Sequence, residues 1–162
     1  MASITTLIAD GSTHPSRTNV KTPYIVSAEF DVVDLIAAKG GALASGDTIE
    51  AIRIPTGSLV KWVGVQVVET AITTTATVDV GYTGGDVDEW VDGFDLESAD
   101  GTFSGYLAAD PTYFAASTSA DTIDVLFATL TGTLSAGKFR VIAELVDVGN
   151  VPAKAGIAQV GS

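Results

Sequence analysis

Two similar stretches, residues 47–69 and 121–147, constrain the fold of this chain more than any other feature. Each begins with Asp-Thr-Ile and an acidic residue, passes a turn that contains Thr-Gly, and ends in a long segment rich in β-branched residues. Apolar and polar residues alternate along both stretches, and a period of two is typical of β-strands. We therefore predict a β-sandwich built around these two units, each forming one Greek-key half.

The rest of the chain favours the same fold class. Residues 24–36 and 76–82 also alternate, although the alternation of the first slips near Val33, where we expect a bulge or the strand end. A short helical turn over 34–39 is compatible with the pattern, but no long segment holds a helical period. We predict an all-β fold, an antiparallel β-sandwich or jelly roll with Greek-key connections and extended terminal arms.

A long loop is predicted over 83–104, where glycine and acidic residues are frequent. Three of its carboxylates, Asp86, Asp88 and Asp92, are spaced closely enough for one flexible loop to bind calcium. The EF-hand motif is absent, because the loop has Trp and Val where that motif needs an oxygen ligand and a glycine. The alternative is a solvated acidic loop, and we predict no metal and no cofactor.

The chain divides into an N-terminal arm over 1–22, a β-sandwich domain over 23–148 and an extended C-terminal tail over 149–162. The arm is rich in Ser and Thr, and it holds Arg17 and Lys21, which make it the one locally basic stretch of an acidic chain. One interpretation is a segment that docks on another subunit through these two cations. The other interpretation is a frayed terminus.

The formal net charge of −12 restricts the partners of this chain. Such a charge repels phosphate backbones and anionic membrane surfaces, so we expect neither a nucleic acid nor a membrane as a partner. The first residues lack the basic start and apolar run of a signal peptide, and no run of about 18 apolar residues predicts a membrane span. We expect a protein that is made and used without export.

The residue types needed for common catalytic sites are scarce. The chain has no cysteine and a single histidine, His14, which excludes thiolate chemistry and a multi-histidine metal site within one chain. Paired carboxylates for sugar hydrolysis remain an alternative, but no spacing singles out a pair. We predict that the protein is not an enzyme.

The aromatic residues allow two interpretations. Trp62 and Trp90, together with Tyr82, Tyr106 and Tyr113, would be suitable for a carbohydrate-binding platform. Aromatic residues of a sandwich are more often anchors in the core or at an interface. We predict this second role for Trp62 and Trp90, and we place both among the candidate partner contacts with Arg17 and Lys21.

Five segments of the chain resemble the head decoration, or cement, proteins of tailed bacteriophages. They are DTIEAIRIPTGSLVKWVGVQVVE, TVDVGY, WVDGFDLESADG, ADTIDVLF and GKFRVIAELVDV. The similarity covers roughly residues 44–148 and leaves the N-terminal arm outside. It is a similarity in the pattern of strands and turns rather than a catalytic signature.

The resemblance implies a jelly roll or β-sandwich on the exterior of the virion capsid, assembled in the host cytoplasm. It implies a homotrimer or homodimer that binds major capsid proteins and clamps them against the pressure of the packaged DNA. The absence of cysteine agrees with assembly in a reducing compartment. The alternatives are a phage tail or fibre module that recognises host glycans and a calcium-dependent carbohydrate-binding module.

Overall fold

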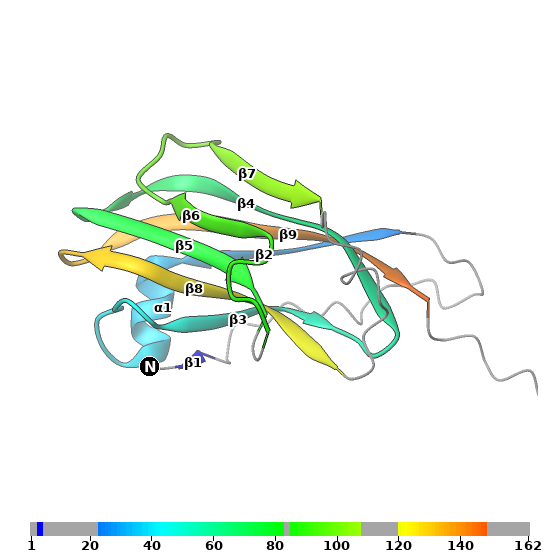
Figure 1. Ribbon diagram of the computed structural model, residues 1–162. Coiled ribbons are helices and arrows are strands. Elements are labelled where there is room, and N and C mark those ends of the chain that lie inside the picture. Colours follow the sequence, from blue (N-terminus) through cyan, green and yellow to red (C-terminus); the bar gives the residue numbers. More distant parts are fainter. Residues whose placement is uncertain (1–2, 5–22, 83–84, 108–119, 149–162) are drawn as a thin grey trace, which may run out of the picture.

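The chain folds into two β-sheets that lie face to face, with one short helix at an end of the sandwich (Figure 1). The computed structural model describes residues 3–4, 23–82, 85–107 and 120–148. The elements are β1 (Ser3–Ile4), β2 (Tyr24–Asp31), α1 (Val32–Lys39), β3 (Thr48–Ile54), β4 (Ser58–Ile72), β5 (Thr75–Gly81), β6 (Val91–Asp95), β7 (Phe103–Leu107), β8 (Asp121–Thr131) and β9 (Ala136–Asp147).

The strand order is that of a jelly roll. One sheet has the order β2-β9-β4-β7, and the other has the order β1-β3-β8-β5-β6. The antiparallel pairs β2–β9, β3–β8, β4–β7 and β5–β6 nest inside one another, as in one long hairpin rolled into a barrel-like sandwich. The two-residue β1 is an exception, because it pairs with β3 in parallel. The predicted all-β sandwich or jelly roll is confirmed.

From the sequence we predicted that each of the two similar stretches forms one half of the sandwich, and this prediction is wrong. They pair with each other, β3 with β8 in one sheet and β4 with β9 in the other. Each stretch contributes one strand to each sheet. Each stretch therefore crosses from one sheet to the other once, at its Thr-Gly turn or close to it. Their similar patterns follow from this arrangement, because paired strands share the same inner and outer faces.

The first predicted strand, 24–36, is five residues too long. Strand β2 ends at Asp31, whose side-chain Oδ1 accepts a hydrogen bond of 2.8 Å from the backbone N–H of Val33 and so caps α1. The helix buries Val32 and Leu35 and ends at Gly40, whose φ of 75° suits the left-handed cap. The slip of the alternation at Val33 marks this change from a period of two to a helical period.

The predicted loop over 83–104 contains a strand, so that prediction is wrong in part. Strand β6 pairs with β5 and buries Val91 and Phe94. Its short length and its many acidic residues hide the alternation in the sequence. Strand β7 then begins at Phe103 and forms the edge of the other sheet.

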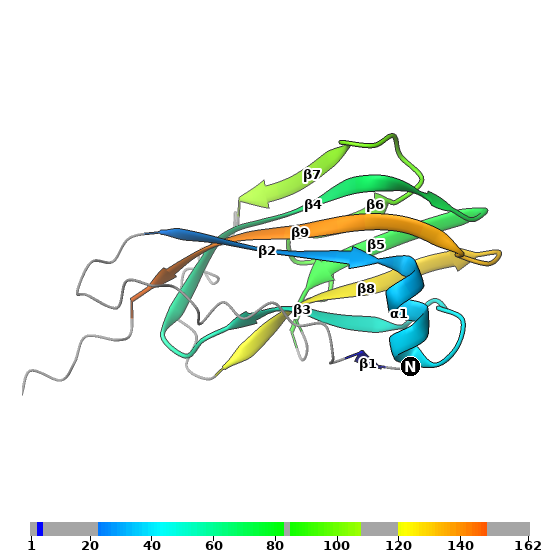
Figure 2. The same cartoon turned by 180° about the vertical axis from the view of Figure 1, so that it is seen from behind.

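The core lies between the sheets and centres on three phenylalanines. Phe30 and Phe139 come from neighbouring strands of one sheet, with ring centroids 5.4 Å apart. Phe127 of the opposite sheet meets Phe139 edge-on at 6.3 Å. Figure 2 shows β2, β9, β4 and β7 following one another across the sheet that supplies Phe30 and Phe139. The contact between Phe127 and Phe139 joins the two layers.

The predicted arms fall largely outside the described residues. Of the segment 1–22 the structure describes β1 alone, and the tail over 149–162 lies outside as well. The division of the chain into arm, domain and tail therefore stays a prediction. In the described part of the chain, no helix is long and apolar enough to cross a membrane.

Candidate interaction surface

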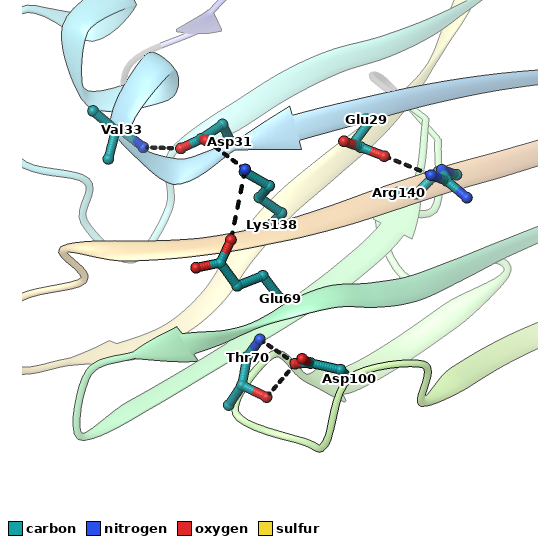
Figure 3. A network of polar contacts seen from close by, with 8 residues as sticks. All are labelled: Glu29, Asp31, Val33, Glu69, Thr70, Asp100, Lys138 and Arg140. Carbon is teal, nitrogen blue, oxygen red and sulfur yellow. Dashed lines mark hydrogen bonds and ion pairs between the residues drawn. The ribbon is translucent and has the colours of Figure 1, made fainter.

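The outer face of the β2-β9-β4-β7 sheet carries a ladder of ion pairs (Figure 3). Arg140 of β9 donates to Glu29 of β2 at 2.6 Å. One row further along the strands, Lys138 lies 3.4 Å from Asp31 and 3.6 Å from Glu69. Each pair joins residues that are partners or near partners in the register, so the ladder follows directly from the strand pairing.

The bridging cation Lys138 is the electrostatic centre of this ladder. The hydrogen bond and charge of Asp31, followed by the charge of Glu69, raise the pKa of Lys138 above its usual value. A raised pKa means that this contribution to stability is complete below the usual value of 10.5 and is lost as the pH rises through the shifted pKa. Because all three side chains are partly exposed and water screens their charges, each pair contributes little to the stability of the fold.

An aromatic pair covers glycines at the β4–β7 edge of the same face. The rings of Trp62 and Phe103 stack with centroids 5.5 Å apart. Beneath them Gly64 and Gly105 are direct partners in the register. A Cβ on Gly64 would lie 2.5 Å from the ring of Phe103, and one on Gly105 would lie 2.8 Å from Trp62. The two glycines are therefore what lets these rings lie flat on the sheet.

Four side chains form an apolar stripe across this face, and they come from all four strands. Ile25 of β2 is 73% exposed and Phe103 of β7 is 46% exposed, while Trp62 and Ile142 between them are half-buried. Ile142 stands in the register beside Gly64, and Ile25 and Trp62 flank it one row along. Below, "apolar stripe" means Ile25, Ile142, Trp62 and Phe103.

Charged pairs lie among the residues of the apolar stripe. Glu144, which binds Lys61 at 3.2 Å, stands in the register between Ile25 and Trp62. Arg140, which binds Glu29, lies in the same row as Phe103. Over the whole face the structure places three cations, Lys61, Lys138 and Arg140, against four carboxylates. The face is therefore close to neutral, with paired charges and apolar side chains interspersed.

The outer face of the other sheet is acidic. Its inward positions are buried and apolar, and the positions between them carry four carboxylates and one described cation, Arg53. The carboxylates are Glu50, Asp79, Asp95 and Asp124, of which Asp124 is buried. Glu50 and Asp124 are direct partners in the β3–β8 register. The two outer faces thus carry the same number of described carboxylates and differ in their described cations.

The candidate calcium residues lie near one another, Asp86 and Asp88 in the loop before β6 and Asp92 within β6. A hydrogen bond with Asp86 raises the pKa of Asp88, and burial and the charges of Asp86 and Asp92 act in the same direction. Within the described ranges, however, the carboxylates do not assemble into a group of three or more with the geometry of a metal site. The loop is a cluster of mutually repelling acids.

The two tryptophans lie in different environments. Trp90 is 4% exposed, and its ring packs at 5.4 Å against Tyr82 in the core. Trp62 lies on the outer face, where it is available for a contact. Arg17 and Lys21 lie outside the described residues, so their role as arm contacts stays a prediction.

Sequence reasoning missed most of the apolar stripe. Ile25, Phe103 and Ile142 are exposed or half-exposed, and the sequence alone does not show which face of each strand points outward. The one available signal was the apolar character of both faces of β4. A strand that is apolar on both faces is covered on both, as in the interior of a sheet or under a partner, and β4 lies between β9 and β7.

A loop anchor next to the ladder provides a pH-dependent contact. Oδ1 of Asp100 accepts hydrogen bonds of 2.7 Å from both the backbone N–H and the hydroxyl of Thr70. These hydrogen bonds lower the pKa of Asp100. The carboxylate therefore stabilises the fold fully above its usual pKa of 3.8, and this contribution disappears as the pH falls through the lowered value.

We expect that Asp100→Asn destabilises the protein slightly at neutral pH and has no effect once the pH is well below 3.8. The measurement is urea unfolding of both proteins at several pH values between neutral and strongly acidic. In a Thr70→Val background, which keeps only the backbone donor, Asp100→Asn should lower the free energy of unfolding by less. A difference that grows on acidification would contradict the assignment.

The fold defines the class of the protein: two β-sheets packed face to face in jelly-roll order. No family model matches the chain, and no curated protein matches it in sequence. Solved structures with the same fold do exist, and they come from viruses of bacteria.

Three solved capsid structures contain chains similar to this one. A chain in the capsid of Ralstonia phage GP4 matches with a TM-score of 0.60 and 17% identity, over 90% of this chain and 98% of that one. A chain in the cyanophage Pam1 capsid asymmetric unit matches with a TM-score of 0.59 and 13% identity, over 82% of this chain and 90% of that one. A chain in the acidic stable capsid of Helicobacter pylori bacteriophage KHP30 matches with a TM-score of 0.53 and 19% identity, over 78% of this chain and 90% of that one. At these identities the shared property is the fold.

Proposed function

We propose that this chain is a structural protein of a bacteriophage head, which binds the outer surface of the shell and stabilises contacts between major capsid proteins. The observation that carries the proposal is the similarity to whole chains of phage capsids. This chain spans 98% of the chain in the Ralstonia phage GP4 capsid, so the two have about the same length and the same jelly roll. A small single-domain chain of this kind is suitable as an accessory subunit of a shell.

The charge of the chain supports a position on the outside. A net charge of −12 and an acidic outer sheet face would be repelled by packaged DNA. On the exterior the same charge keeps a densely covered particle soluble. The stabilising mechanism is mechanical rather than catalytic: area buried between subunits is lost when the shell ruptures, so binding opposes rupture. Many copies on a fixed lattice add avidity to weak contacts.

The test uses phage heads that lack this protein. The purified full-length chain is added, and both its bound stoichiometry and the temperature of DNA release are measured. We expect saturable binding and a higher release temperature. Failure of the chain to bind the shells at any concentration tested would exclude the proposed function.

The arm has its own test. We expect that Arg17→Glu with Lys21→Glu weakens shell binding, most strongly at low salt, because both cations would face acidic capsid surfaces. Arg53→Glu is the matched control, since Arg53 is an exposed cation on β3 outside the arm. Equal losses in both variants would point to net charge rather than to the arm.

Glycan recognition, as in a tail or fibre module, is the second candidate. The stacked rings of Trp62 and Phe103 are partly exposed and lie flat on the sheet, an arrangement against which a sugar ring can pack. A glycan screen of the wild type and of Trp62→Ala tests it, with and without calcium. Binding that depends on Trp62, in a protein that ignores shells, would favour this candidate.

A further inference from the structure

We propose that strand β7 is the part of this chain that binds the shell, and that an extended segment of the major capsid protein pairs with its outer edge. The inference rests on the proposed function for the identity of the partner. It adds the place of the contact and its chemistry, which is the pairing of two backbones.

The backbone of β7 is paired on one side only in the part of the chain that the structure describes. Strand β7 is the outermost strand of its sheet and pairs with β4 alone (Figures 1 and 2). The carbonyl of Thr102 accepts a hydrogen bond of 2.9 Å from the N–H of Val67. Because the backbone groups of an antiparallel strand alternate in direction, those of Phe103 and Gly105 point away from β4. Both residues and Ser104 between them are exposed, so a further strand can reach this row of donors and acceptors.

Strand β7 lacks the features that protect the other edge strands from pairing. Edges of natural sheets are usually protected by charged residues, by bulges or by a very short length. Strand β2 carries Glu29 and Asp31, and β1 has two residues. Strand β6 carries Asp92 and Asp95, and Gly93 between them has a φ of 62° and lies at a register shift. Strand β7, with the sequence FSGYL, has no charged residue and pairs with β4 in a regular register. Among the described edges, β7 is therefore the one suited to strand addition.

An aromatic surface beside this edge can hold the side chains of the added segment. The ring of Phe103 is 46% exposed and stacks on Trp62, with the centroids 5.5 Å apart. Gly64 and Gly105 leave the space in which these two rings lie. Neighbouring strands of a sheet place their side chains on the same two faces, so a residue of the added strand would lie beside the ring of Phe103. We expect that residue of the partner to be apolar.

The chemistry of the edge identifies the occupant as an extended polypeptide. A helix satisfies its own backbone groups and cannot pair with a row of strand donors and acceptors. A glycan would pack on the rings of Trp62 and Phe103 without using the backbone of β7. An uncharged strand has no group that selects an ion. Because chains of this fold occur in phage capsids, the proposed function supplies the major capsid protein as the source of the segment.

The first experiment places a charge on the edge and measures binding to heads that lack this protein. Ser104 is exposed and stands beside the buried Val65 in the register, so Ser104→Lys adds an inward-pointing charge of the kind that natural edges use against pairing. We expect the concentration for half-saturation of the shells to rise about tenfold or more. Ser27→Lys is the matched control, because Ser27 is exposed on β2, the opposite edge of the same sheet. Circular dichroism and melting temperature establish that both variants are folded.

The second experiment uses the wild type and needs no substitution. Hydrogen exchange is measured by mass spectrometry on the free protein, at several concentrations, and on the protein bound to shells. We expect the amides of Phe103 and Gly105 to exchange more slowly on the shells, because pairing protects them. The exchange of β2 should stay the same.

The outcomes separate this inference from the proposed function. If Ser104→Lys binds shells as the wild type does, if both lysine variants lose binding equally, or if β7 exchanges equally fast in the bound state, the inference is wrong and the head function stands. Protection of β7 that develops in the free protein as its concentration rises would assign the edge to a second copy, which also refutes the inference. A wild type that does not bind shells would refute the inference together with the proposed function.

Discussion

Replacing Phe139 with alanine is expected to lower the free energy of unfolding by about 3–5 kcal/mol. Phe139 is 1% exposed and contacts Phe30 within its own sheet and Phe127 of the opposite sheet. Its removal leaves a cavity where the two layers meet, and the surrounding strands are held by their hydrogen bonds and cannot collapse into it. Urea unfolding followed by circular dichroism measures the loss.

Phe103→Ala is the control for this prediction. It removes the same side chain from a site that is 46% exposed, where the ring contacts Trp62 and solvent. We expect a loss of about 1 kcal/mol, the size of an exposed aromatic contact. If Phe103→Ala were as costly as Phe139→Ala, the layer contact around Phe139 would not be the centre of the core.

Breaking the pair between Lys39 and Asp47 is expected to cost about 3 kcal/mol. Lys39 ends α1, and its ammonium binds Asp47 and the carbonyl of Ala42 at 2.7 Å. The same carboxylate accepts a 2.8 Å hydrogen bond from the N–H of Ala44. The side chain of Asp47 is 4% exposed, so Lys39→Met leaves a buried carboxylate without its cation. The variant is compared with the wild type by thermal and urea unfolding.

Two further variants decide whether burial causes this loss. Adding Asp47→Asn to Lys39→Met removes the stranded charge and should restore part of the stability, because the amide oxygen still accepts from Ala44. Lys61→Met breaks the half-exposed pair with Glu144 and should cost under about 1 kcal/mol. Equal losses in Lys39→Met and Lys61→Met would show that burial does not matter here.

The local patterns of the sequence were sufficient for most strands. The alternation of β5 and the two Asp-Thr-Ile stretches predicted extended segments that the structure contains. Two elements were predicted incompletely for a local reason: α1 was expected only as a possible helical turn over 34–39, and β6 was expected as loop. In α1 the helical period spans two turns only, and in β6 glycine and acids interrupt the alternation. Such short elements owe their form to packing on the rest of the fold.

The candidate surface could be predicted less well than the fold. Trp62 was among the predicted contacts, whereas Phe103, Ile25 and Ile142 were not, and Trp90 lies in the core. An exposed isoleucine and a buried one look alike in a sequence. Their difference depends on which face of the strand points to the opposite sheet.

The sequence by itself determined the all-β class, the acidic charge and the positions of most strands, because these depend on composition and on a period of two residues. Only the tertiary structure decided that the two similar stretches pair with each other, that β6 exists and that ion pairs and apolar side chains share one outer face. The reason is that strand order and register join residues far apart in the chain. Ser27 stands beside Ile142, and Gly64 beside Gly105, through contacts that no local pattern encodes.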